Sequence, residues 1–325
     1  MSEIRIGTCG WSYPSGAGTW NGLFYPPRGA RGQTARAFDE LAYYADHFNT
    51  VEVNSTFYRP PVATVTRRWA GRTPPGFDFS LKLYQKFTHA ASIGRNPGSP
   101  ARGASGAANT IPEVGQPQVD EFRAAIDPLA EAGKLAALLA QFPPSFRQSD
   151  ASLEYLAWLL TAFRGYELAV ELRHRSWSDN LATTLRLLNQ AGAAWVQIDE
   201  PKFRFSIRQN YLPNQKGLYY MRLHGRNAAK WWQHENAGER YNYLYSPEEL
   251  KEFAETATTV RALVKKSYIY LNNHFAAKAI VDAVVLKREL GEPITGEYRP
   301  QLVSAYPFLK DIVVAAQGDR LPLSG

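Results

Sequence analysis

Residues 51–61 read VEVNSTFYRPP, and this stretch shows the pattern on which the fold prediction rests. Val51 and Val53 alternate with Glu52, as expected for a β-strand with one apolar face. The strand runs directly into asparagine, serine, threonine and two aromatic residues before two prolines end the segment. An apolar strand with a polar and aromatic end is typical of a strand that delivers functional groups to one end of a parallel barrel.

Seven further segments have the same strand character, being short and rich in β-branched and aromatic residues, and amphipathic helical patterns separate most of them. With residues 50–55, the predicted strands are 4–10, 77–83, 135–142, 168–174, 193–199, 218–224 and 267–273. Strands that alternate with helices predict a parallel sheet covered by helices. Eight strands are the number that a (β/α)8 barrel requires, whereas an open doubly wound sheet usually has about five or six. We therefore predict an α/β fold consisting of a single TIM-type barrel.

Three segments depart from a regular barrel repeat. Residues 201–217, PKFRFSIRQNYLPNQKG, look extended rather than helical, so we expect a degenerate crossover after the sixth strand. Residues 90–118 are rich in Gly, Pro, Ala and Ser, which predicts a long loop after the third strand, over the barrel mouth. Proline-rich residues 291–325 predict a C-terminal tail that packs on a barrel domain formed by residues 1–290.

Two predicted helices carry start signals. The sequence Ser246-Pro247-Glu248-Glu249 offers a capping serine followed by proline at the first helical position. Ser178-Asp179 offers a similar start before the apolar stripe that begins at Leu181.

Composition limits the class of protein. The N-terminus shows no signal-peptide pattern, and no window approaches the roughly 18 consecutive apolar residues of a membrane helix. Cys9 is the only cysteine, which excludes an internal disulfide framework and favours a buried structural role over a nucleophilic one. These features predict a soluble cytoplasmic protein without a membrane partner, and nothing in the sequence indicates an oligomeric state. The net charge of +7 favours anionic partners, although the positive residues are scattered and form no nucleic-acid-binding arm.

Polar residues gather at the C-terminal ends of the predicted strands, where a TIM-type barrel carries its site. Alternate residues of a strand point to the same side, and the intervening residues here are apolar and should face the outer helices. The charged set should therefore point into the barrel. The pairs that share this inner face are Glu52 with Asn54, Glu171 with Arg173, and Arg222 with His224.

A charge inside the barrel is costly to bury unless it is paired. We expect Glu171 to pair with Arg173 or Arg222. We expect Glu52 to pair with Lys82 or His224. An alternative interpretation is that these residues form an internal ion network that fills the barrel and carries no chemistry.

Several motifs resemble the YecE-like family, a domain of unknown function, and they occur in the same order over roughly residues 3–285. They are GTCGWSYPS (7–15), LFYPP (23–27), YYADHFNTVEVNSTFYRPP (43–61), RRWAGRTPPGFDFSLKL (67–83), LAALLAQFPPSFR (135–147), VELRHRSW (170–177), YMRLHGRN (220–227) and YIYLNN (268–273). The resemblance implies a single TIM barrel, similar in fold to the sugar-isomerase and endonuclease IV type of barrel, and it implies no particular reaction. Cys9, the 90–118 loop and the tail depart from the family pattern.

The residues at the strand ends support a site for an anionic ligand. Glu52, Glu171 and His224, with Asp199 as a further candidate, are the groups expected to exchange protons in catalysis. The expected substrate-binding residues are anion-binding cations, amides that form hydrogen bonds, and aromatic rings that stack on a sugar or base. They are Lys82, Arg173, Arg222, Arg226, Asn54, Asn272, Asn273, Trp11, Tyr13, Phe57, Tyr58 and Trp177.

No cofactor is predicted, because the glycines match neither a P-loop nor a dinucleotide-binding fingerprint. Four histidines fall near strand ends, namely His89, His174, His224 and His274. There is no HxxxH or HExxH spacing, and nearby arginines already neutralise the carboxylates, so a divalent metal is not favoured and no metal ligand is predicted.

The leading hypothesis is an enzyme, a hydrolase or an isomerase, that acts on a phosphorylated or otherwise anionic sugar-like or nucleotide-like molecule in the barrel mouth. The competing hypothesis is a nucleic-acid-binding or repair-associated barrel without turnover, which would resemble endonuclease IV only in fold. A third is a ligand-sensing protein that has lost catalysis.

Overall fold

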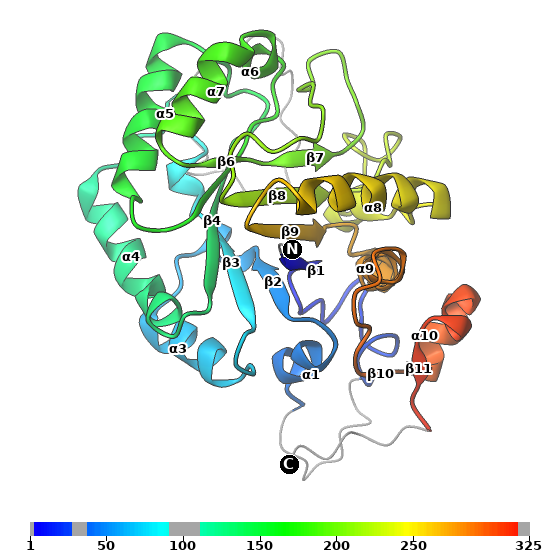
Figure 1. Ribbon diagram of the computed structural model, residues 1–325. Helices are drawn as coiled ribbons and strands as arrows, with labels where there is room; N and C mark the ends of the chain where they lie inside the picture. The colour runs from blue at the N-terminus through cyan, green and yellow to red at the C-terminus, as the bar shows by residue number, and fades with distance from the viewer. Residues whose placement is uncertain (1–2, 28–37, 91–110, 318–325) are drawn as a thin grey trace.

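The computed structural model describes residues 3–27, 38–90 and 111–317. Parallel strands form its centre and helices surround them, as Figure 1 shows. The strands are β1 (Glu3–Cys9), β2 (Thr50–Val53), β3 (Asp78–Lys82), β4 (Leu135–Gln141), β5 (Leu168–Glu171), β6 (Ala194–Trp195), β7 (Gln197–Asp199), β8 (Leu218–Leu223) and β9 (Lys266–Leu271). Each lies inside or overlaps a predicted strand, so the prediction of a TIM-type barrel is confirmed.

The hydrogen-bonded strand order is β6-β5-β4-β3-β2-β1-β9-β8-β7, and the pairings are parallel. Because β6 and β7 are successive halves of the predicted sixth strand, separated only by Val196, the order ends where it began. The sheet therefore closes into a barrel of eight strand positions. Its two ends meet at the break in the sixth strand.

At the break, the first half of the strand pairs with β5 and the second half pairs with β8. Each half therefore leaves one edge without a neighbouring strand. At the first half, Trp195 N donates to Asn214 Oδ1 at 2.7 Å, and Asn214 Nδ2 donates to Ala193 O at 2.9 Å.

The side-chain amide of Gln209 forms the corresponding hydrogen bonds at the free edge of the second half. The backbone N–H of Ile198 donates to Gln209 Oε1 at 3.1 Å, and Gln209 Nε2 donates to Val196 O at 2.7 Å. Both amides come from residues 201–217, which contain no helix. The predicted degenerate crossover is therefore confirmed, and its side-chain amides replace strand neighbours.

Helices cover the outside of the barrel (Figure 1), whereas short helices and 3-10 turns lie in the connections that follow strand ends. The helices are α1 (Glu40–His47), α2 (Ser55–Tyr58), α3 (Ala63–Gly71), α4 (Gln116–Glu131), α5 (Asp150–Ala162), α6 (Ser176–Asp179), α7 (Leu181–Gln190), α8 (Pro247–Arg261) and α9 (Lys278–Glu289). The turns are η1 (Gln85–Phe87), η2 (Ala237–Tyr241) and η3 (Phe275–Ala277). The apolar faces of the helices pack against the outward-facing residues of the strands to form the core. In the described ranges, no helix combines the length and apolarity needed to cross a membrane.

The predicted helix start at Ser246 is confirmed, because Ser246 Oγ accepts from Glu249 N at 3.2 Å and Glu249 Oε2 accepts from Ser246 N at 2.8 Å. The predicted start at Ser178-Asp179 is wrong. These residues lie inside α6, where the Asp179 carboxylate pairs with Arg175, and Asn180 precedes α7 instead.

The C-terminal segment contains β10 (Glu297–Tyr298), α10 (Pro300–Ala305), η4 (Pro307–Asp311) and β11 (Val314–Ala315). Tyr298 is fully buried, and its ring contacts His47 of α1 at 4.7 Å between centroids. The described part of this segment is thus packed on the barrel, to the side of α9 in Figure 1. Most of the predicted 90–118 loop, residues 91–110, lies outside the described residues, as do residues 318–325.

Replacing Gln209 or Asn214 with alanine should destabilise the barrel, because each change leaves a buried backbone N–H and C=O of the sixth strand without a partner. We expect each variant to lose about 1–3 kcal/mol of unfolding free energy in urea denaturation. Asn210→Ala removes an exposed amide of the same segment and should change little. Wild-type stability for both Gln209→Ala and Asn214→Ala would show that these amides do not support the strand.

Candidate functional site

The centre of the barrel is occupied by the side chain of Arg222, which comes from β8 and is 1% exposed. Its Nε and Nη2 donate to the two carboxylate oxygens of Glu52 at 2.9 and 2.7 Å. Its Nη1 donates to Glu171 Oε2. One guanidinium therefore joins carboxylates from β2 and β5, and both carboxylates are fully buried.

A second guanidinium lies above the first. Arg173 Nε donates to Glu171 Oε1 at 2.7 Å, and Arg173 Nη1 donates to Glu200 Oε2 at 2.8 Å. His224 Nε2 lies 3.2 Å from Arg173 Nη2 and 3.7 Å from Glu171 Oε2. The other ring nitrogen, Nδ1, lies 2.8 Å from Asn272 Nδ2.

We call Glu52, Glu171, Arg173, Glu200, Arg222 and His224 the central network. Further groups complete its hydrogen bonds: the Tyr220 hydroxyl donates to Glu52 Oε2 at 2.7 Å, and Arg222 Nη1 donates to Gln141 Oε1 at 2.9 Å. Cys9 Sγ lies 3.7 Å from Arg222 Nη2, and burial raises the pKa of this thiol.

The inward orientation predicted from strand parity is confirmed by these contacts. The expected pairing of Glu171 is also confirmed, with both Arg173 and Arg222 as partners. The expected pairing of Glu52 with Lys82 or His224 is wrong, because the long Arg222 side chain crosses the barrel and binds Glu52 through two nitrogens.

The charges of the central network are fixed by its contacts. Burial disfavours the charged carboxylate of Glu171, but the guanidiniums of Arg173 and Arg222 hold its pKa well below the ordinary range. Burial, with repulsion from Arg222, lowers the pKa of His224 to about 3, so its imidazole is neutral. Burial raises the pKa of Glu200. Glu171 is therefore a weak base, whereas Glu200 is a carboxyl group that protonates more readily.

Lys82, at the end of β3, differs from the other cations of the mouth. Its Nζ lies 3.8 Å from the centre of the Phe57 ring, and the residue is 9% exposed. Among the residues that the structure describes, none accepts a hydrogen bond from this nitrogen or forms an ion pair with it. Burial, with repulsion from Arg222, lowers the pKa of Lys82 to about 7.

Two polar residues accompany Lys82. Asn54 directly follows β2, whose last residue Val53 pairs with Leu81, the residue that precedes Lys82 in β3. The buried Asn54 Oδ1 has no hydrogen-bond partner in the described structure. His89 packs against the Phe57 ring with centroids 4.9 Å apart, and its Nδ1 contacts Thr88 Oγ1 at 2.9 Å.

Burial, together with the positive charge of Lys82, lowers the pKa of His89 to about 3, so this imidazole is neutral as well. We call Asn54, Phe57, Lys82 and His89 the entrance cluster.

The remaining aromatic candidates occupy different environments. Tyr58 is 59% exposed, Trp11 packs edge-on against Trp69 with centroids 5.5 Å apart, and Tyr13 stacks on His274 at 4.3 Å. Trp177 is fully buried and its Nε1 donates to the backbone of Phe146, so it has no exposed face for a ligand.

Three other predicted site residues lie outside the central network and the entrance cluster. Arg226 donates to both oxygens of Asp199 at 2.9–3.0 Å, and it also pairs with a glutamate of α8. Asp199 further accepts from the Tyr245 hydroxyl at 2.8 Å. Asn273 is fully buried and donates to Asp282 of α9 and to a backbone carbonyl. These contacts tie loops to helices.

The site residues predicted from the sequence do not include four residues of this region, Gln141, Tyr220, Glu200 and His89, although His89 was noted near a strand end. Tyr220 shares strand parity with Arg222, and Gln141 ends β4, so both carried a usable signal. The positions of Glu200 and His89 depend on the turns after β7 and β3, which parity does not describe. Within the described ranges, no three His, Cys, Asp or Glu side chains converge as metal ligands would.

Comparison with known proteins identifies the family. A family model described as a protein of unknown function, DUF72, matches residues 5–303. The chain belongs to the DUF72 family. The YecE-like resemblance of its motifs points to this same family.

Relatives of this DUF72 chain match most of its length, and two solved structures share its fold. The UPF0759 protein YunF of Bacillus subtilis is 27% identical over 284 residues, which is 85% of this chain and 90% of that protein. A DUF72 protein structure from Thermotoga maritima has 32% identity and a TM-score of 0.70, covering 89% of this chain and 99% of that one. A DUF72 structure from Enterococcus faecalis has 22% identity and a TM-score of 0.71, covering 90% and 96%. The family is described as one of unknown function.

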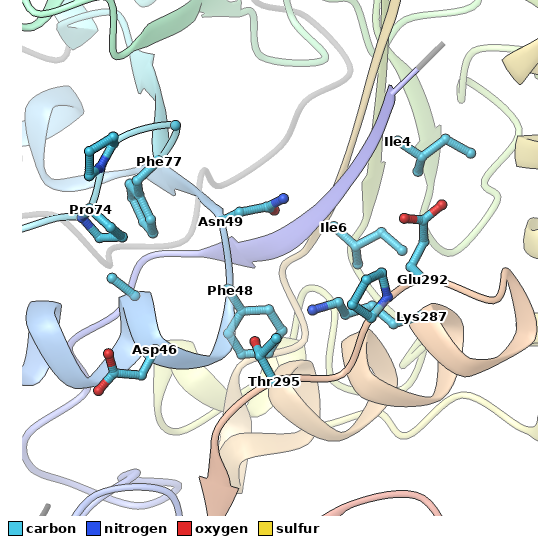
Figure 2. Close-up of a pocket in the computed structure, with 14 residues that line it drawn as sticks. Ile4, Ile6, Asp46, Phe48, Asn49, Pro74, Phe77, Lys287, Glu292 and Thr295 are labelled. Carbon is cyan, nitrogen blue, oxygen red and sulfur yellow. The ribbon is translucent and has the colours of Figure 1, made fainter. Parts of the chain in front are cut away.

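A cavity of about 290 Å³ lies at the opposite end of the barrel of this DUF72 protein, lined by Ile4, Phe48, Phe77 and Lys287 among others (Figure 2). Its buried cation is already engaged, because Lys287 Nζ donates to His47 O at 3.2 Å in the last turn of α1. Residues at the N-terminal ends of barrel strands generally serve stability. We therefore place the candidate site at the mouth, in the central network and the entrance cluster.

Removing Arg222 should destabilise the protein strongly, because Glu52 and Glu171 would remain as buried charges without their shared partner. We expect Arg222→Met to lose about 3–5 kcal/mol of unfolding free energy in urea denaturation. Arg222→Lys, which keeps the charge but not the planar fork, should lose less.

The control is Arg175→Met, which removes a partly exposed ion pair with Asp179 and should cost at most about 1 kcal/mol. Equal losses for Arg222→Met and Arg175→Met would contradict the central role of Arg222.

Proposed function

We propose that this DUF72 protein is an enzyme that binds a small anionic, sugar-like molecule at the C-terminal mouth of the barrel. The ligand would contact the entrance cluster and lie above the central network. One observation carries the proposal: Lys82 is a nearly buried cation at the mouth for which the described structure provides no acceptor. Buried charges are normally paired, so a ligand oxygen is the natural partner.

The neighbours of Lys82 favour a ligand with hydroxyl groups. Asn54 Oδ1 is a buried acceptor without a donor, and a sugar hydroxyl would satisfy it. The neutral imidazole of His89 offers a further polar contact. The Phe57 ring, which contacts Lys82 Nζ and the His89 ring, contributes apolar surface against which the C–H face of a sugar can pack.

The arginines were expected from the sequence to hold the anion, and their contacts favour a different role. Arg222 is fully buried between Glu52 and Glu171, and Arg173 is paired with Glu171 and Glu200. These guanidiniums would have to release carboxylates before they could bind a phosphate. We therefore assign the ligand oxygen to Lys82 and a supporting role to the arginines.

Proton transfer would then fall to Glu200 rather than to Glu52 or Glu171. The carboxyl of Glu200 is held by Arg173 through Oε2, and burial raises its pKa. A carboxyl group that protonates more readily than its neighbours is suited to act as an acid or base in isomerisation or hydrolysis. Glu52 and Glu171 would hold the two arginines in place.

The proposal predicts that sugar phosphates and sugar acids raise the melting temperature of the protein, whereas the uncharged parent sugars do not. A ligand present at about 100 times its Kd adds about 2.7 kcal/mol of stability, which a thermal-shift assay detects readily. Lys82→Met should weaken binding by roughly tenfold or more, because it removes a charged hydrogen bond worth about 1.5–3 kcal/mol.

Lys86→Met provides the matched control, since Lys86 is an exposed lysine four residues further along the same segment. It lowers the net charge equally but should leave the thermal shift unchanged. Equal shifts with charged and uncharged sugars, or unchanged binding by Lys82→Met, would refute the assignment.

A second candidate function, nucleic-acid binding, is supported by a separate surface on the 201–217 segment. A cavity of about 370 Å³ there is lined by Arg175, Lys202, Phe203, Arg204 and Arg208, among others. The Phe203 ring stacks on Phe205 at 5.7 Å and contacts Trp232, which is 46% exposed, at 5.6 Å. Basic side chains beside exposed aromatic rings are the combination that binds single-stranded nucleic acids.

This candidate predicts salt-dependent binding of a fluorescent oligothymidine, measured by anisotropy. Replacing both Arg204 and Arg208 with methionine should reduce the slope of log affinity against log salt by about 0.7 for each lost phosphate contact. Trp232→Ala should cost about 1–3 kcal/mol of binding if a base stacks there. The control Lys310→Met removes an exposed lysine in the C-terminal segment, and an equal effect from it would argue against this surface.

A further inference from the structure

We propose that Lys82 is a catalytic nucleophile that forms a Schiff base with a carbonyl carbon of the bound ligand. The substrate class is then narrowed to anionic aldehydes and ketones, such as open-chain sugar phosphates and 2-oxo acids. This inference rests on the proposed function, because it requires the ligand to lie on the entrance cluster. The protonated Lys82 first binds the ligand oxygen, which is the carbonyl oxygen, and its neutral form then attacks the attached carbon.

Lys82 differs from the other buried lysines of the described structure in what its amine contacts. Lys134 Nζ donates to three oxygens at 2.6–2.9 Å, and Lys287 Nζ donates to the carbonyl of His47. Both amines stabilise helix or loop ends. Lys82 Nζ lies over the Phe57 ring and, within residues 3–27, 38–90 and 111–317, donates to no oxygen, so no described group holds its lone pair once a proton leaves.

The backbone of Lys82 is held firmly beneath this free amine. Thr56 Oγ1 donates to Lys82 O at 2.6 Å, and the following residue, Leu83, donates its N–H to Leu139 O at 2.9 Å. The nucleophile is therefore attached to a strand end that is bonded on both sides. A rigid support of this kind keeps a reacting group in place relative to its ligand.

The charged surroundings favour the neutral amine. Arg222 from β8 and Arg173, which follows β5, repel the ammonium, whereas Glu171 and Glu52 attract it from β5 and β2. His89 is neutral and adds no charge. Burial and Arg222 dominate, and the resulting pKa of about 7 leaves a large fraction of the amine deprotonated at neutral pH. Desolvation beside other cations is a known way to activate a lysine for carbonyl chemistry.

The chemistry balances without an external oxidant or reductant. The Lys82 nitrogen attacks the carbonyl carbon, the C–N bond forms, and the π electrons move to the oxygen, which takes a proton. The proton lost by the nitrogen is the one that this oxygen takes up. The carbinolamine hydroxyl then takes a second proton from solvent and leaves as water, while the nitrogen lone pair forms the C=N bond. The sum is amine plus carbonyl plus one proton giving a protonated imine plus water. The protonated imine withdraws electrons from the adjacent carbon, where Glu200 can exchange a proton.

The inference is tested by reductive trapping. The full-length protein is incubated with sodium cyanoborohydride together with one carbonyl probe at a time: dihydroxyacetone phosphate, glyceraldehyde 3-phosphate or pyruvate. Adducts are then mapped by peptide mass spectrometry. We expect a dominant adduct on Lys82 with at least one probe. Its rate of formation should rise with pH through about 7 and then level off, because only the neutral amine attacks.

Three variants separate the possible outcomes. Lys82→Met should lose the adduct, and Lys86→Met should keep it. Lys82→Arg keeps a cation but cannot form an imine, so it should retain part of the ligand-induced thermal shift and lose trapping completely. Circular dichroism confirms that each variant is folded.

Labelling spread equally over surface lysines, or no Lys82 adduct with any probe while anionic ligands still raise the melting temperature, would overturn the Schiff base and leave the proposed function standing. Absence of both the adduct and the thermal shift would overturn both proposals.

Discussion

The structure depends on one buried guanidinium. Arg222 binds Glu52 of β2 and Glu171 of β5, and β8 supplies the arginine itself, so three strands from different parts of the barrel are joined at its centre. Two carboxylates and one guanidinium would each be costly to bury alone. The hydrogen bonds and ion pairs that Arg222 makes with both carboxylates offset this desolvation cost. The interior of this barrel is therefore polar at its upper end. It forms a charged floor beneath the mouth. Burial, with repulsion from the Arg222 guanidinium of this floor, lowers the pKa of both Lys82 and His224.

Much of the fold follows from short-range pattern. Strand alternation predicted the eight strand positions and the inward orientation of the charged residues, because both depend only on neighbouring residues. The capping serine at Ser246 was identifiable for the same reason. The start proposed at Ser178-Asp179 failed because Asp179 forms an ion pair with Arg175 inside a short preceding helix. A sequence pattern alone does not distinguish a capping carboxylate from a paired one.

The site was less predictable than the fold, because its contacts cross the barrel. Parity placed Glu52 and Arg222 on the inner face but could not show that an arginine side chain spans the interior to reach Glu52. Lys82 was expected as a partner for that carboxylate, but Arg222 occupies the position, and no other acceptor for Lys82 lies in the part of the chain that the structure describes. Trp177 and Asp199 lie near strand ends, yet their side chains serve helix packing and a separate ion pair.

The break in the sixth strand has a consequence for how the barrel moves. Side-chain amides can rotate away from a strand edge one at a time, whereas a neighbouring strand must separate as a unit. The junction held by Gln209 and Asn214 is therefore the natural place for the cylinder to open transiently, and its amide protons should exchange with solvent sooner than those of β1 or β9. Glu200 directly follows β7, so such opening would displace one wall of the mouth relative to Lys82. The closure of the barrel and the geometry of its mouth are in this way coupled.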